Sequence, residues 1–196
     1  ESPQSMALSL TRVFANRNYA WFVGGGGPAY VTSWMQRVAV GWLAWELSHS
    51  PLMLGIVAAA DLAPMLVLSP FAGALADRNT PITIVRRTEA LIFLQNTLLF
   101  AFMLAGWLNI TLLILLSLWS GLVYPFHQAA RHSVVPAIVP RADFPTAIAL
   151  DSALFQVSRF IGPMIAAIII PTFGVVGCFL AHAIGTAWYL FSLWKL

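Results

Sequence analysis

The sequence predicts an all-helical membrane protein in which six transmembrane helices form one bundle. This prediction rests on composition and on the length of the apolar runs. The chain is 60% hydrophobic and only 9% charged, with a mean hydropathy of +0.83, whereas roughly a quarter of the residues in a soluble domain are charged. The apolar residues are gathered in runs of about 20 or more, the length that a helix needs to cross a bilayer.

Six such runs follow one another, each bounded by polar or turn-forming residues. In hydrocarbon every backbone N–H and C=O needs a partner within the protein, which restricts a spanning segment to a helix or a closed barrel. The runs lack the strict alternation of barrel strands, so we expect helices. The expected spans are 20–46, 51–76, 82–107, 110–130, 146–171 and 174–196.

The connections between the runs indicate how the helices are arranged. The three outer turns, about 48–51, around Asn109, and about 171–174, are short, so the helices that they join must be antiparallel neighbours. The longest inner loop, about 131–145, divides the bundle into two groups of three helices. Such a 3+3 division is found in membrane proteins with inverted repeats, although the two triplets share no convincing sequence repeat.

The basic residues predict the orientation of the bundle. Most of them fall on or near one side of the predicted bundle, whereas the outer turns contain none, and the positive-inside rule then places the N-terminus in the cytoplasm. These residues are Arg12, Arg17, Arg78, Arg86, Arg87, Arg131, Arg141 and Lys195. We therefore expect a cytoplasmic segment over 1–19, a six-helix bundle over 20–196, and a location in the cell inner membrane.

Several classes of function are disfavoured. Six spans within 196 residues leave no room for a soluble catalytic domain, and the chain lacks hydrolase signatures such as HExxH, so we expect no enzyme. The net charge is +3, but the basic residues form no patch with interleaved aromatics, so we expect no nucleic-acid partner. Cys178 has no partner cysteine, and His127, His132 and His182 lack ligand spacing, so we expect no metal and no cofactor.

Arg37 and Asp61 are the most informative charges, because each lies inside a predicted span. An ionised group there costs at least about 2.5–3.5 kcal/mol and normally needs a partner or water. Both residues are twelve positions from His49, near the turn between the first two helices, so at about 1.5 Å per residue they reach a similar depth. The two side chains either line a polar cavity, where Asp61 takes up a proton, or form a fixed pair that locks two helices together.

Further polar residues lie in the third and fifth helices. Asp151 and Arg159 are eight positions apart, which puts them on a broadly similar helix face; with Gln156 they either share a polar track or pair with other helices. Near the start of the third helix, Arg86 and Glu89 are three positions apart, and we expect a local ion pair worth a few tenths of a kcal/mol.

Glycine and proline interrupt the first and fifth helices. Residues 24–27 are glycines and Pro28 follows them, which removes side-chain packing and one backbone donor. Gly162 and Pro163 interrupt the fifth helix just after Arg159 and form a predicted kink. Each interruption is either a site of close helix packing or a bend that moves during gating.

Three strings resemble the N-terminal six-helix half of the major facilitator superfamily. GALADR at Gly73–Arg78 resembles the loop signature between the second and third helices, although residues 79–82 replace the basic residues that usually follow. AARHSVVPAIVPRADFPTAIAL at 129–150 is similar to the loop between helices four and five of siderophore and drug exporters of the enterobactin-exporter branch. SRFIGP at Ser158–Pro163 is similar to the helix-five signature of drug:proton antiporters.

The resemblance implies half of a major facilitator fold, in which two six-helix bundles rock about a central site and export a small molecule in exchange for protons. It also implies a cytoplasmic gate that contains Gly73, Asp77 and Arg78. Together with the interior charges, it predicts a substrate or proton cavity formed by Arg37, Asp61, Asp151, Gln156 and Arg159.

The expected partners follow from the same resemblance. They are the lipid bilayer, a small-molecule substrate and a second six-helix bundle, which is either a missing C-terminal half or a second copy of the chain. The alternative is a membrane scaffold or assembly module that derives from a transporter half and no longer transports.

Overall fold

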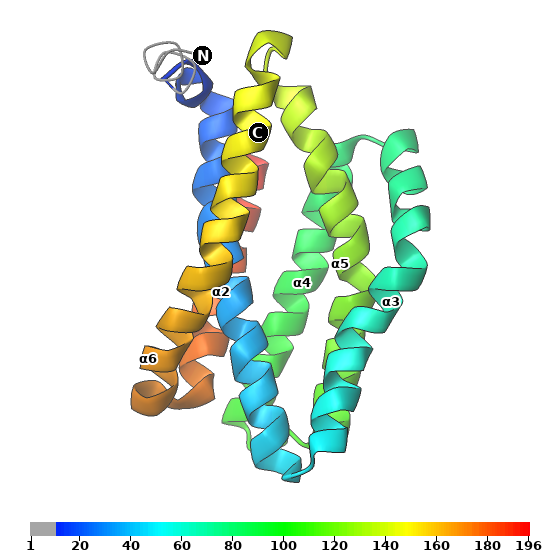
Figure 1. The fold of residues 1–196 in the computed structure, drawn as a ribbon, viewed down its shortest axis with the longest axis vertical. Coiled ribbons are helices and arrows are strands. Elements are labelled where there is room, and N and C mark those ends of the chain that lie inside the picture. Colours follow the sequence, from blue (N-terminus) through cyan, green and yellow to red (C-terminus); the bar gives the residue numbers. More distant parts are fainter. Residues whose placement is uncertain (1–10) are drawn as a thin grey trace.

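The computed structural model describes residues 11–196, and almost all of this range is helical, with no strand. Residues 1–10 of the expected N-terminal segment lie outside the described residues. A short helical stretch at 11–15 precedes the long helices, which lie along the long axis of the molecule (Figure 1). The elements are α2 (Arg17–Ser48), α3 (Pro51–Arg78), α4 (Pro81–Leu104), α5 (Ile110–Ile138), the 3₁₀ turn η1 (Arg141–Asp143) and α6 (Phe144–Trp194). The prediction of an all-helical fold is confirmed.

Local sequence determines where these helices begin. The side chain of Asn16 accepts hydrogen bonds of 3.0 and 3.2 Å from two N–H groups of the first turn of α2. Asn109 accepts a similar bond of 2.9 Å at the start of α5. Pro51 and Pro81 occupy the first position of α3 and α4, where proline costs no intrahelical hydrogen bond. Side-chain caps therefore supply partners for the first N–H groups of α2 and α5, whereas a first-turn proline removes one N–H group that would lack a partner in α3 and α4.

A break at Gly174 divides α6 into two limbs, 144–173 and 175–194. Gly174 has φ +69° and ψ −179°, a non-helical conformation that glycine adopts at little cost. The chain turns back at this point, so that the second limb lies behind the first in Figure 1. This break coincides with the short turn that the sequence predicts between its fifth and sixth apolar runs.

One helix boundary differs clearly from the prediction. α5 continues to Ile138, so the loop expected over 131–145 is wrong for its first eight positions. Arg131 belongs to this extra helical length and is 1% exposed. It does not lie in solvent at the cytoplasmic side, because partners on other helices neutralise its charge within the bundle.

Two apolar clusters lie at different levels along the helices. The first cluster includes Phe22 of α2, Val85 of α4 and Leu193 of the second limb of α6. The second includes Leu43 of α2 and Leu113 of α5. Most buried polar side chains of α4, α5 and α6, such as Glu89, His127 and His182, come between the two clusters along each helix, so a polar layer separates the clusters.

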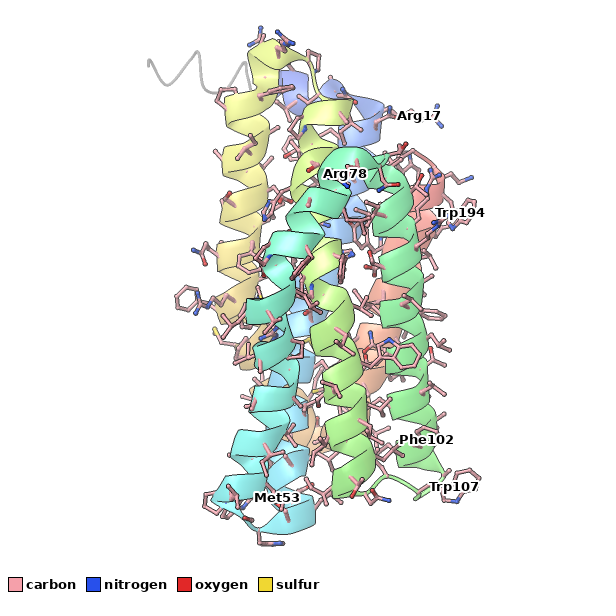
Figure 2. All side chains as sticks on the ribbon, turned by 90° about the vertical axis from the view of Figure 1, so that its right-hand side faces the viewer. Arg17, Met53, Arg78, Phe102, Trp107 and Trp194 are labelled. Carbon is pink, nitrogen blue, oxygen red and sulfur yellow. The ribbon has the colours of Figure 1, made fainter. Side chains whose placement is uncertain are left out.

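Three described helical segments are long and apolar enough to cross a membrane by length and composition, namely Pro51–Ala76, Ile110–Ile138 and Arg141–Trp194. The last contains both limbs of α6. Large apolar side chains are exposed along them, as expected for surfaces that contact lipid, and Leu66 is 82% exposed. Figure 2 shows Arg17, Arg78 and Trp194 near one end of the bundle and Met53, Phe102 and Trp107 near the other.

Glycines allow close helix crossings beside the polar layer. A Cβ added to Gly121 of α5 would lie 2.5 Å from the carbonyl oxygen of Asp61 on α3, and one added to Gly162 would lie 2.7 Å from the carbonyl oxygen of Val31 on α2. Both neighbours are backbone atoms, which cannot rotate away. Gly162 is therefore a close-packing site, and α6 stays helical through Pro163, as α2 does through Pro28.

Gly121→Ala is expected to lower the free energy of unfolding by about 1–3 kcal/mol, because an extra methyl group in a packed crossing forces backbone shifts. The measurement is denaturant-induced unfolding of the purified protein in detergent. Gly55→Ala is the matched control, because nothing lies within 4 Å of the Cβ that it would add on α3. Equal stabilities of the two variants would contradict the close crossing of α3 and α5.

Candidate functional site

A cavity of 230 Å³ occupies the polar layer between the two apolar clusters. It is lined by α2, α3, α4, α5 and the second limb of α6. Its walls carry guanidinium, carboxylate, amide, imidazole, hydroxyl and phenol groups. Such a concave site, in which polar groups converge within apolar surroundings, is typical of small-molecule binding.

Arg131 forms the most extensive polar network of the cavity wall. Its Nη2 donates a 2.9 Å hydrogen bond to Asp151 Oδ1, and its Nε and Nη1 donate to the hydroxyls of Tyr30 and Tyr189. The guanidinium carbon also lies 4.2 Å from the ring centre of Tyr30 and 4.5 Å from that of Phe22, distances at which cations attract aromatic faces. One buried side chain thus connects α5 with α2 and with both limbs of α6.

Arg37 and Asp61 form a second ion pair with looser geometry. Arg37 Nη2 lies 3.5 Å from Asp61 Oδ2, and the two side chains are 35% and 23% exposed. The Arg37 guanidinium also lies 5.2 Å from the ring centre of Trp34 and 5.7 Å from that of Tyr124. The structure therefore contains the pair that the hairpin geometry allows, and both residues line the cavity.

The other three predicted cavity residues lie elsewhere. Asp151 pairs with Arg131 of another helix and not with Arg159. Gln156 and Arg159 are exposed on the first limb of α6 and are not part of the cavity wall. The guanidinium carbon of Arg159 lies 5.4 Å from the ring centre of Trp34.

The residues of the predicted gate lie at the end of α3. Gly73 is partly buried within the helix, and Arg78 is its exposed last residue. Asp77 belongs to the helical backbone, but its side chain lies outside the described part of the structure. Gly162 and Pro163 lie in the first limb of α6, where Gly162 packs against α2.

The prediction of a local pair between Arg86 and Glu89 is wrong. Arg86 donates to the carbonyl oxygen of Leu193 through Nε at 3.0 Å and Nη2 at 2.8 Å. Glu89 instead points toward α5, where its Oε2 lies 3.6 Å from Nδ1 of His127. The spacing of Glu89 and Asn96, seven positions apart on α4, is the signal that could have indicated a shared buried face.

Several polar atoms on residues of the cavity wall have no hydrogen-bond partner among the described residues. These atoms are Oε1 of Gln36, Oε1 of Glu89 and both side-chain amide atoms of Asn96. Buried polar groups are hydrogen-bonded in most folded proteins, so an unpartnered group calls for a specific reason. Residues of one cavity wall thus carry three acceptors and one donor that a polar molecule inside the bundle can satisfy.

Asp151→Ala is expected to destabilise the protein by about 3–5 kcal/mol, because it leaves the buried charge of Arg131 without its counter-ion. The measurement is the same unfolding assay in detergent. Arg12→Ala is the control, because Arg12 is 63% exposed and pairs at 3.4 Å with Asp143 near the end of the bundle. A loss no larger than that of the control would contradict a structural role for the buried pair.

Comparisons with known proteins identify the family. Residues 15–196 match the family model described as transmembrane secretion effector. The chain is 26% identical over 176 residues to the staphyloferrin A transporter of Staphylococcus aureus, covering 89% of this chain and 42% of the relative. It is 31% identical over 120 residues to the uncharacterized MFS-type transporter y4rN of Sinorhizobium fredii, covering 60% of this chain and 29% of the relative.

The chain spans less than half the length of the curated relatives that it matches, and no solved structure was found to match it. The family model nevertheless covers all the long helices and the whole cavity wall. The chain is therefore a multi-pass membrane protein that belongs to the transmembrane secretion effector family of major facilitator transporters.

Proposed function

We propose that the chain forms one six-helix half of a secondary transporter that exports a small polar molecule by alternating access, in exchange for protons. The observation on which this proposal rests is the polar cavity between two apolar clusters. A cavity that contains Arg37 and Asp61 well inside their helices offers a molecule charged and hydrogen-bonding partners inside the membrane. Such intramembrane ionisable groups commonly mark substrate and ion pathways.

The proposed topology has six spans in two groups of three. The helices α2, α3 and α4 form one group, and α5 with the two limbs of α6 forms the other. The basic residues near one end, including Arg17 and Arg78 in Figure 2, support a cytoplasmic N-terminus in the cell inner membrane. The division into a segment over 1–19 and a bundle over 20–196 is part of this proposal.

A second six-helix bundle is required because alternating access needs two bundles that close on a shared site. The exposed residues Gln156 and Arg159 support its presence, since a charged side chain that faced lipid tails would be costly. We place the second bundle, or the water-filled path between bundles, against this face of α6. Gly73, Asp77 and Arg78 at the end of α3 then form the cytoplasmic gate.

The description of the family as secretion effectors supports export as the direction. Staphyloferrin A, the compound named for one relative, is the first substrate to test. The cavity supports a polar substrate of this general kind, because it presents Arg37, Asp61 and the unpartnered amide of Asn96. We assign Arg37 and Asp61 to substrate binding and not only to the contact between α2 and α3.

Asp61→Asn is expected to lower the rate of staphyloferrin A transport by about tenfold or more, equivalent to about 1.4 kcal/mol, because Arg37 loses its counter-ion in the cavity. The measurement uses proteoliposomes that contain the transporter with its second bundle, an imposed pH gradient and labelled substrate. Glu46→Gln is the matched control, since Glu46 is exposed near the end of α2 and contacts Trp42.

Thermal unfolding of each variant in detergent shows whether a loss of transport reflects a loss of folding. A substrate flux that is equal with and without the pH gradient would contradict proton coupling. Crosslinking in native membranes tests the assembly, and a strictly monomeric chain that meets neither a second half nor a second copy would contradict the half-transporter proposal.

A further inference from the structure

Glu89 has no counter-ion of its own in the cavity. Arg37 pairs with Asp61, and Arg131 pairs with Asp151, which leaves Glu89 beside His127 as the carboxyl that no described arginine or lysine contacts. Glu89 is 2% exposed, and a buried carboxylate without a counter-ion is strongly disfavoured in apolar surroundings. Its charge must therefore be cancelled in another way.

The hydrogen bonds of Thr88 determine which tautomer His127 adopts. The hydroxyl of Thr88 has one proton, and the carbonyl oxygens of Ile84 and Val85 lie 2.8 and 3.1 Å away as acceptors for it. When the proton is given to either carbonyl, the hydroxyl accepts from Nδ1 of His127, which lies 3.2 Å away. In this arrangement Nδ1 of His127 carries a hydrogen and lies near both the Thr88 hydroxyl and the Glu89 carboxyl. His127 is neutral when Nε2 is unprotonated.

The distance between Glu89 and His127 is longer than that of a charge-assisted hydrogen bond. Oε2 of Glu89 lies 3.6 Å from Nδ1 of His127, which is too long for a hydrogen bond, whereas a carboxylate would draw this N–H to about 2.7–2.9 Å. Oε1 has no partner at all. We propose that Glu89, assisted by His127, is the site where the cavity binds and releases a proton.

The proton exchanges with water in the cavity. The O–H bond of the Glu89 carboxyl breaks, the electron pair stays on the carboxylate oxygen, and a water molecule takes the proton as hydronium. A volume of 230 Å³ has room for several water molecules, since one needs only about 10–15 Å³ of such space. The N–H of His127 then turns from Thr88 to the carboxylate and stabilises the charge.

Several ionisable groups from the surrounding helices would respond to a charge on Glu89. From α5, Arg131 and Tyr124 interact with it electrostatically, and from α6 Tyr189 does so. From α2, Tyr30 interacts with Arg131, Tyr124 and Tyr189, and from α3, Asp61 interacts with Tyr124. On α4 itself, Arg86 is directed to Leu193 and Arg87 lies in the first turns of the helix.

Ionised Glu89 would be a second anion for Arg131, in competition with Asp151. Loss of the proton therefore weakens the hold of Arg131 on the first limb of α6 and draws Arg131 electrostatically toward α4. A proton taken up from the cavity has the opposite effect. This link between proton binding and helix contacts rests on the proposed function, whereas proton binding by Glu89 does not.

Infrared spectroscopy of protein with ¹³C-carboxyl-labelled glutamate tests proton binding directly. The chain contains only three glutamates, Glu1, Glu46 and Glu89, so the isotope-shifted bands report on these three groups. We expect one band of a protonated carboxyl to persist at neutral pH, to be lost in Glu89→Gln and to remain in Glu46→Gln. A spectrum of the unmutated protein in which all labelled glutamates are ionised at neutral pH would overturn the proposal without any variant.

Transport assays distinguish a failure of this inference from a failure of the proposed function. In proteoliposomes with the second bundle, Glu89→Gln should retain the exchange of labelled for unlabelled staphyloferrin A. Its substrate flux driven by a pH gradient should fall at least tenfold. Retention of gradient-driven flux in this variant would overturn Glu89 as the coupling site. Absence of all transport by the unmutated protein would contradict the proposed function and leave the infrared result to decide proton binding.

Glu89→Asp is the second variant in case Glu89→Gln does not fold. It keeps the carboxyl group but withdraws it from His127 by one methylene, so the protonated band should shift to the unlabelled aspartate region and gradient-driven flux should fall less than in Glu89→Gln. Equal flux losses in two folded variants would indicate that the size of the side chain matters and not its proton, and would overturn the proposal.

Discussion

The buried pair of Arg131 and Asp151 is the interaction on which the rest of the bundle depends. Arg131 is 1% exposed, and its guanidinium is acceptable there only because one carboxylate, two hydroxyls and three aromatic rings surround it. These partners come from α2 and from both limbs of α6. Any arrangement that separates these segments leaves a charge unpaired in apolar surroundings, so the pair selects one packing of four helical segments.

The ion pair inside the cavity and the one at its edge differ in what they allow. Arg131 and Asp151 are fully enclosed and make short hydrogen bonds, which suits a fixed connection. Arg37 and Asp61 lie 3.5 Å apart and remain partly exposed, so a ligand can replace one partner without opening the bundle. Glu89 lies between these extremes: it is enclosed, but its proton alone decides whether Arg131 faces one anion or two.

The sequence predicts the helices well because apolar runs and turn residues are local signals. The break at Gly174 and the starts at Pro51 and Pro81 follow directly from such signals. The end of α5 was predicted too early because Arg131 has the properties of a loop residue until Asp151 and Tyr189 are placed beside it. The neighbour of Glu89 is missed for the same reason: spacing favours Arg86 on the same helix, whereas His127 on α5 lies beside it. Partners that are far apart in sequence cannot be identified from spacing alone.

Glycine positions explain how closely the helices approach one another at the cavity walls. Gly121 lets α5 approach the carbonyl oxygen of Asp61 itself, and a Cβ on Gly26 would lie 2.5 Å from the guanidinium of Arg131. Close contacts therefore occur at the level of the charged groups. The backbone contact at Gly121 fixes how α5 lies beside Asp61, and Gly26 makes room for the guanidinium of Arg131. Rotation of side chains, and the proton on Glu89, remain as the changes that cost least.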